Sequence, residues 1–239
     1  MELASAIASE ISGICDDVFT IQIVPPGLIH FELTHSTLAT WLQSLVVGSL
    51  WGVGNREEAR ELLAGSKGEE FSPLPPAPRP SASCVCPMPN LFAVQYAHAR
   101  CCSLVLLAHR EGLIKLREPV PNTSPAFWSV ISPNPLPWLN CDGTLRLNHP
   151  DERRLIGELI QVVDNIECPD VKGSVKWEKV ALSLSQAFEK FWCSCRIWGE
   201  VKITLPELAQ ARLGLLMATQ SVLRFVLEEN LGVFAPLEL

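Results

Sequence analysis

Four segments with apolar residues at helical spacing fill the second half of the sequence, and they constrain the fold more than any other feature. An apolar face of this kind has to be covered by another element. Pro206, at the start of the last segment, suits the first turn of a helix, where the backbone N–H has no partner within the helix. The four segments are residues 91–110, 151–165, 175–198 and 206–231. They predict a bundle of helices packed face to face.

Smaller elements are predicted before the bundle. Two short stretches rich in β-branched residues alternate as strands do, and Pro25-Pro26-Gly27 between them is typical of a turn. Ser36 is a suitable N-cap for the helix that follows. We expect helices at residues 2–13, 36–50 and 56–64, and strands at residues 19–24 and 28–33. The predicted fold class is therefore mainly α: a helical bundle preceded by a small α+β cap.

Two proline-rich stretches divide the chain. Residues 65–90 hold seven prolines among Ser, Ala and Gly, which makes the backbone extended and is typical of a linker. The second stretch, residues 119–137, contains Phe127 and Trp128, so we expect a loop that packs on the bundle. The predicted domains are a small unit at 1–64, a linker at 65–90, and the bundle at 91–239 with an insertion at 119–137.

Composition narrows the class of protein. Hydrophobic residues make up 48% of the sequence, which is too many for a disordered chain. The apolar runs are short and interrupted, and the N-terminus lacks the pattern of an export signal, so we expect a soluble, cytoplasmic protein. The nine cysteines are scattered, which favours small buried hydrophobes over a disulfide framework or a zinc site. We expect no metal and no cofactor.

A run at the start of the predicted bundle carries a family resemblance. The residues from Phe92 to Arg100 read Phe-Ala-Val-Gln-Tyr-Ala-His-Ala-Arg, and they resemble the opening helix of the DALR anticodon-binding domain of arginyl-tRNA synthetases. Three later segments resemble that domain in the same order, at residues 152–156, 184–195 and 212–236. The chain departs from the family at Leu237, where a Glu is usual. The resemblance implies a helical anticodon-binding domain.

A shorter match lies upstream. The segment from Val24 to Leu33, followed by Trp41-Leu42, is similar to the Gly-Pro-Gly-Phe-Ile-Asn-Phe-Arg-Leu segment of the synthetases' N-terminal tRNA-binding domain. Pro25 stands where that pattern has its first Gly. The similarity implies that residues 1–64 are a remnant of that domain.

Catalytic motifs of the synthetases are missing from the sequence. Neither a His-x-Gly-His turn nor a Lys-Met-Ser-Lys-Ser loop occurs, and no Gly-x-x-x-x-Gly-Lys-Ser/Thr phosphate loop replaces them. We therefore assign no catalytic residue and expect that this chain alone does not aminoacylate tRNA.

Candidate RNA-binding residues lie in and just after residues 92–110. The resemblance implies that this helix approaches the anticodon stem and loop, and an aromatic ring, a guanidinium, an amide and an imidazole suit stacking, phosphate and base edges. The candidates are Gln95, Tyr96, His98, Arg100, Arg110, Lys115 and Arg117. The alternative is that the helix packs inside the bundle, with Tyr96 and His98 satisfied internally and the later cations simply solvated.

The resulting functional hypothesis is a non-catalytic tRNA-binding module, with tRNA(Arg) favoured, that acts alone or for a partner enzyme. A protein-interaction scaffold that lost RNA affinity is the first alternative, because the net charge is −7 and only residues 91–149 carry more basic than acidic residues. The tRNA-binding subunit of a split arginine–tRNA ligase is the second. The RNA-binding hypothesis would be favoured if five basic residues converge on one surface: Arg100, Arg110, Lys115, Arg117 and Arg146.

Overall fold

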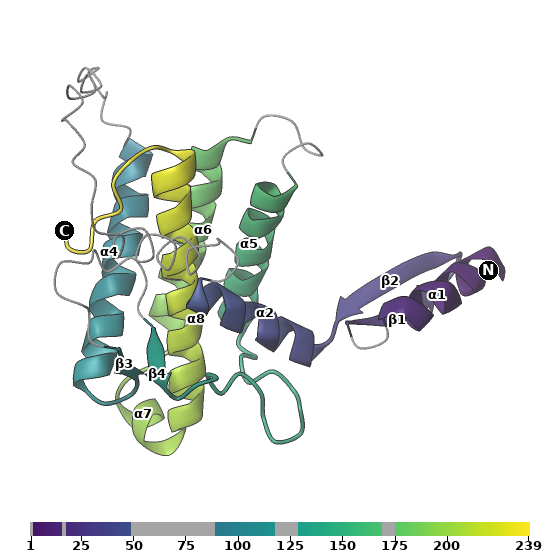
Figure 1. Cartoon of the computed structure of the whole chain (residues 1–239), viewed down its shortest axis with the longest axis horizontal. Helices are drawn as coiled ribbons and strands as arrows, with labels where there is room; N and C mark the ends of the chain where they lie inside the picture. The colour runs from purple at the N-terminus through teal and green to yellow at the C-terminus, as the bar shows by residue number, and fades with distance from the viewer. Residues whose placement is uncertain (1, 16–17, 49–88, 118–128, 169–174) are drawn as a thin grey trace, which may run out of the picture.

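Four of the described helices are long and stand side by side, as the apolar periodicity predicts (Figure 1). The computed structural model describes residues 2–15, 18–48, 89–117, 129–168 and 175–239. The long helices are α4 (Pro89–Arg110), α5 (Pro150–Glu167), α6 (Trp177–Ser194) and α8 (Pro206–Phe225). The predicted mainly α fold is confirmed.

Helix α8 is the centre of the bundle. Its residues between Ala209 and Leu223 are buried on nearly every side, which is typical of a helix surrounded by other helices. It packs against α2, α4, α5 and α6 and against the short helix α7 (Glu200–Thr204). The α-helical geometry ends at Phe225, and a π-helical turn, η3 (Val226–Asn230), completes the segment predicted to run to residue 231.

A buried ion pair joins the start of α5 to α8. The imidazole of His149 caps the helix, and Glu152 accepts a hydrogen bond from the His149 backbone N–H at 2.8 Å, which completes a capping box. Arg212 of α8 donates from Nε to the other Glu152 oxygen at 2.6 Å. Its guanidinium also donates to the carbonyl of Arg196. The Glu152 side chain is only 1% exposed, and its carboxylate is hydrogen-bonded to groups from two elements.

Helix α2 (His35–Val47) packs on the bundle, although it falls in the residues predicted to form a separate N-terminal unit. Leu42 and Leu45 are fully buried in the core that the bundle helices share. The helix is capped by Thr34, whose side chain accepts a hydrogen bond from the Thr37 N–H. Ser36, the expected N-cap, instead lies within the first turn.

A side chain of α2 is fastened to the loop that precedes α5. Gln43 Oε1 accepts hydrogen bonds from the Leu136 N–H at 3.1 Å and from the Trp138 indole at 2.9 Å. The Trp138 ring lies directly on Gly214 of α8, where a Cβ atom would be 2.5 Å from the ring. Three segments far apart in the sequence therefore meet at one place in the core.

The remaining N-terminal elements form an arm beside the bundle (Figure 1). They are α1 (Glu2–Cys15), β1 (Phe19–Val24) and β2 (Leu28–Leu33), and the two strands pair antiparallel with Phe19 opposite Leu33. Both strands have the bounds that the sequence predicts. The Val24 carbonyl accepts a hydrogen bond from the Gly27 N–H and closes the turn.

A second small sheet follows α4. It pairs β3 (Lys115–Leu116) with β4 (Val130–Ser132), and the chain then runs over the bundle through the buried residues Leu136 and Trp138. Part of the predicted proline-rich insertion therefore packs on the core, as expected. The helix expected at 56–64 and nearly all of the linker at 65–90 lie outside the described residues, so the division into domains stays a prediction.

Candidate nucleic-acid interface

Helix α4 has one solvent-exposed stripe along its whole length. The exposed residues follow one another at spacings of three and four, which places them on one side of an α-helix. They are Phe92, Tyr96, Arg100, Ser103, Leu107 and Arg110. The opposite side is buried against α6 and α8, where Val94, Ala97, Cys101 and Val105 are less than 2% exposed. We call this row the α4 stripe.

Two stacked aromatic rings form the N-terminal end of the α4 stripe. The rings of Phe92 and Tyr96 lie with their centroids 6.4 Å apart and their planes 25° apart. Phe92 is 64% exposed and Tyr96 is 47% exposed. Exposed aromatic faces of this kind can stack on unpaired bases, and they do so with little dependence on base identity. A ring stacked in the core, the alternative for Tyr96, does not fit this exposure.

Arg100 lies in the middle of the stripe over an aromatic ring from α6. Its guanidinium carbon is 5.4 Å from the centroid of the Trp192 ring, and the side chain stays exposed. Trp192 in turn meets Trp198 edge to face, with centroids 5.7 Å apart. The cation–π contact limits the freedom of the guanidinium, so less ordering entropy is lost when it binds a phosphate. Trp192 is not among the candidates predicted from the sequence, because its contact with Arg100 joins two different helices.

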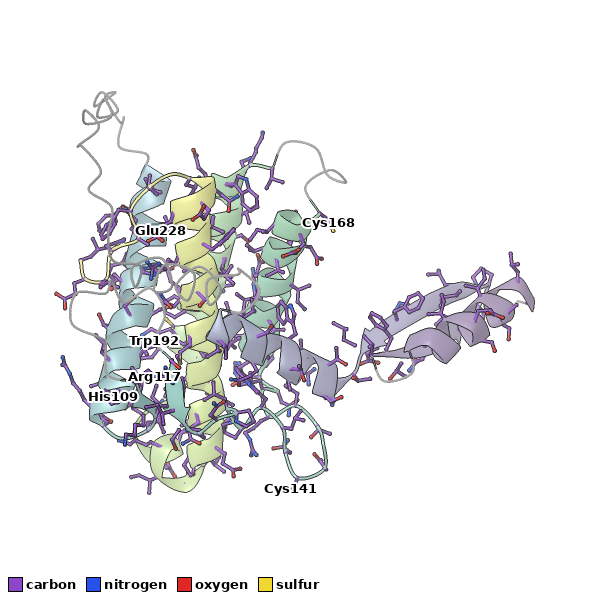
Figure 2. The ribbon with its side chains drawn as sticks, in the orientation of Figure 1. His109, Arg117, Cys141, Cys168, Trp192 and Glu228 are labelled. Atoms are coloured by element: carbon purple, nitrogen blue, oxygen red, sulfur yellow. The ribbon has the colours of Figure 1, made fainter. Side chains whose placement is uncertain are left out.

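Three exposed cations gather at the C-terminal end of α4. Arg110 ends the helix, and Lys115 and Arg117 follow on and next to β3. The Leu116 N–H donates to His109 Nδ1 at 3.3 Å, which ties β3 to the end of the helix. Figure 2 shows His109 and Arg117 together at this end of α4. Lys115 and Arg117 are exposed on either side of the buried Leu116, so the three cations lie near one another at this end of α4.

Arg146 does not join these cations. It donates to the carbonyl oxygens of Pro137 and Leu139 and forms an ion pair with Glu207 at 2.7 Å. Its guanidinium therefore fixes the loop before α5. Of the five basic residues whose convergence would favour RNA, four lie along α4 or at its end, and Arg146 has a structural role.

His98 and Gln95 face the C-terminal tail. His98 is fully buried, and its Nδ1 lies 2.8 Å from the Pro236 carbonyl, so this nitrogen carries the proton and donates. Its Nε2 then accepts from the Gln220 amide at 3.0 Å. Gln95 donates to the Phe234 carbonyl at 2.9 Å. These two candidates hold the tail against α4, so for His98 the packing alternative agrees with the structure.

Burial determines the ionisation of the groups around His98. Desolvation lowers the pKa of His98 to about 4, and the nearby Arg224 acts in the same direction, while the hydrogen bond to Pro236 opposes them. Burial also raises the pKa of Cys102 to about 12, so its thiol, 3.8 Å from His98 Nδ1, stays protonated. His98 and Cys102 are therefore both uncharged at physiological pH, and together with Gln220 and the Pro236 carbonyl they form a structural network.

The described residues support neither of two other kinds of site, a metal centre or a membrane-spanning helix. Within the described parts of the chain, no group of three or more His, Cys, Asp or Glu side chains is placed to hold a metal ion. Segment Leu91–Arg110 is long and apolar enough to cross a membrane by composition, but half of it is buried inside the bundle. A core helix of a folded protein meets the same criterion.

A helical bundle that presents one aromatic and basic helix to solvent is typical of a nucleic-acid-binding domain. The family model of the DALR anticodon binding domain matches residues 94–239, which is more than half of the chain, and the chain belongs to this family. The matched region begins within α4 and includes all later helices.

Curated relatives agree with the family. An arginine–tRNA ligase of Synechococcus sp. (strain JA-3-3Ab) is 33% identical over 144 residues, which are 60% of this chain and 21% of the ligase. The arginine–tRNA ligase of Gloeobacter violaceus is 31% identical over 135 residues, covering 56% of this chain and 20% of the ligase. The chain thus spans about a fifth of the length of these relatives. No solved structure matches it significantly.

Proposed function

We propose that the chain is a non-catalytic tRNA-binding module and that the α4 stripe is its RNA-binding surface. The observation that carries the proposal is the exposed row on α4, with two rings at one end, Arg100 in the middle and Arg110 at the other end, on a helix whose opposite side is buried. Membership of the DALR family supports an anticodon stem and loop as the target. The arginine–tRNA ligases among the relatives favour tRNA(Arg).

The dimensions of the α4 stripe suit a stem-loop. Phe92 and Arg110 are eighteen positions apart, which corresponds to about 27 Å along a helix. The rings at one end can stack on unpaired loop bases, and the cations at the other can contact backbone phosphates. Arg100, held over Trp192, lies between these two regions. One helix therefore offers both kinds of contact in the order in which a hairpin presents loop and stem.

The test is a titration of the purified protein with total tRNA at low and physiological salt, followed by sequencing of the bound RNA. We expect enrichment of tRNA(Arg). Replacing both Tyr96 and Arg100 with Ala should weaken binding roughly tenfold or more, because a stacking ring and a phosphate contact are lost. Arg154→Ala, which removes an exposed cation from α5, is the matched control and should bind as the parent does. Equal affinity of both variants would contradict the proposed surface.

A protein-interaction role is the second candidate. It is favoured by the net charge of −7 and by the absence of any Lys or Arg before residue 56. The two roles are compatible, since an RNA-binding bundle can serve a separate enzyme through another surface. Phosphate contacts are strongest at low salt. If the chain binds no tRNA even there, the tRNA-binding role is excluded and only the scaffold role remains.

A further inference from the structure

The arm at residues 2–33 has an apolar sheet face that is only half covered. By the strand register, the inward residues of β1 and β2 oppose one another on this face: Phe19, Ile21, Ile23, Ile29, Phe31 and Leu33. Helix α1 packs mainly on β1, whose three inward residues are half-buried. On β2, Phe31 is 49% exposed and Leu33 is 37% exposed. The uncovered half of the face thus lies over β2.

The arm has little core of its own. Among its described residues only Ala8 is buried, and Leu3 and Ile7 of α1 are exposed as well. A two-stranded hairpin is at best marginally stable in water, and it gains stability when its apolar face is packed. The position of the arm is nevertheless fixed at its base, because α2 follows β2 after a single residue and is locked to the bundle through Gln43 and Trp138.

Charge selects the kind of partner that can cover this face. Residues 1–48 contain five Asp or Glu side chains and no Lys or Arg. Phosphates would be repelled by such a surface, so RNA does not suit it. A second arm would bring the same negative charge to the interface, which disfavours pairing of two copies. A positively charged protein segment is the complementary occupant.

We propose that the arm is a docking surface for an amphipathic helix of a partner protein, with apolar residues against Phe31 and Leu33 and with Lys or Arg toward the acidic side chains. A helix laid beside α1 covers the open half of the face and completes a two-layer sandwich of helices on a sheet. A strand added to the edge of β2 would satisfy backbone groups but leave both side chains uncovered. The inference depends on the arm alone and not on RNA binding by α4.

A photo-cross-linking amino acid tests the position of the partner. It replaces Phe31 in the full chain, and in the matched control it replaces His30, the exposed neighbour that points to the opposite face. We expect a protein cross-linked through position 31 and not through position 30. The captured protein is then identified, purified and titrated against the unmodified chain. Cross-links only to a second copy or only to RNA, or equal yield at both positions, would overturn the proposal.

Charge reversal tests the recognition without disturbing the apolar face. The substitution Glu10→Lys changes an exposed acidic side chain of α1, and Glu189→Lys is the matched change on the bundle. We expect Glu10→Lys to weaken binding of the purified partner roughly threefold or more at low salt, with a smaller effect at high salt, and Glu189→Lys to leave it unchanged. An affinity that neither salt nor Glu10→Lys changes would contradict a basic partner. A parallel tRNA titration reports the α4 stripe separately.

Discussion

At the scale of single residues, neighbouring positions of one helix have opposite roles. Gln95 and His98 point to the C-terminal tail and hold the carbonyl oxygens of Phe234 and Pro236, while Tyr96 and Arg100 point to solvent. The quoted family motif therefore combines residues that build the domain with residues available to a ligand. Glu152 is a further motif residue with a structural role, as the partner of Arg212 and of the His149 backbone.

The His98 network predicts a pH-dependent stability. The native pKa is about 4 against an ordinary value of 6.5, so between these values the unfolded chain binds the proton and the folded chain does not. Stability should rise with pH across this window and fall by at most about 3 kcal/mol as the pH drops through it. His98→Asn, which keeps a donor for Pro236 and cannot titrate, is the comparison. Unfolding free energies measured at several pH values should differ in slope between the two proteins only in this window, and identical slopes would contradict the prediction.

At the scale of elements, α2 connects the arm to the bundle. Its apolar face is part of the common core, and Gln43 links it to the loop carrying Trp138, which lies on Gly214. The absence of a side chain at position 214 allows the indole to approach the backbone of α8. A helical glycine would otherwise cost stability relative to Ala.

This contact predicts opposite effects for two Gly→Ala substitutions in helix interiors. At Gly157 of α5 nothing lies within 4 Å of the new Cβ, so Ala should stabilise the protein by up to about 1 kcal/mol. At Gly214 the Cβ would lie 2.5 Å from Trp138 and 2.7 Å from Leu136, so Ala should destabilise it by about 1–3 kcal/mol. Denaturant unfolding of both variants measures the difference. Stabilisation at both positions would show that Trp138 does not need this space.

At the scale of the whole molecule, the distribution of charge separates two surfaces. The net charge is −7, yet Arg110, Lys115 and Arg117 lie together at the end of α4, and the arm carries only acidic formal charges. An acidic protein can bind RNA if one face concentrates its cations, because the interaction is screened beyond about 8–10 Å at physiological salt. The basic C-terminal end of α4 and the acidic arm therefore suit different kinds of partner.

The basic end predicts the salt dependence of RNA binding. Each phosphate contact adds nearly one to the slope of log affinity against log salt concentration, so Arg117→Ala should reduce that slope by about one. Arg154→Ala, on α5, should leave it unchanged. Affinities measured over a range of salt concentrations give both slopes. A slope that Arg117→Ala does not change would mean that this cation contacts no phosphate.

Much of the local structure follows from the sequence. The helical periods, the strand pair with its turn, and the proline at the start of α8 were sufficient to predict the bundle and the strand bounds, because each depends on neighbours a few positions away. The run from Phe92 to Arg100 likewise pointed to the helix that carries the candidate site. The spacing of three and four positions also places Gln95 and His98 on one face of this helix and Tyr96 and Arg100 on a neighbouring one.

Which of those faces meets solvent was decided by the tertiary structure alone. The C-terminal tail lies 138 positions away from His98 in sequence, and its carbonyls bury that residue. Gln43 and Trp138, 95 positions apart, join α2 to the bundle in the same way. Long-range contacts of this kind depend on how complete elements pack, and no local pattern encodes them. The sequence therefore determined the elements and the candidate helix, whereas packing selected the residues that a partner can reach.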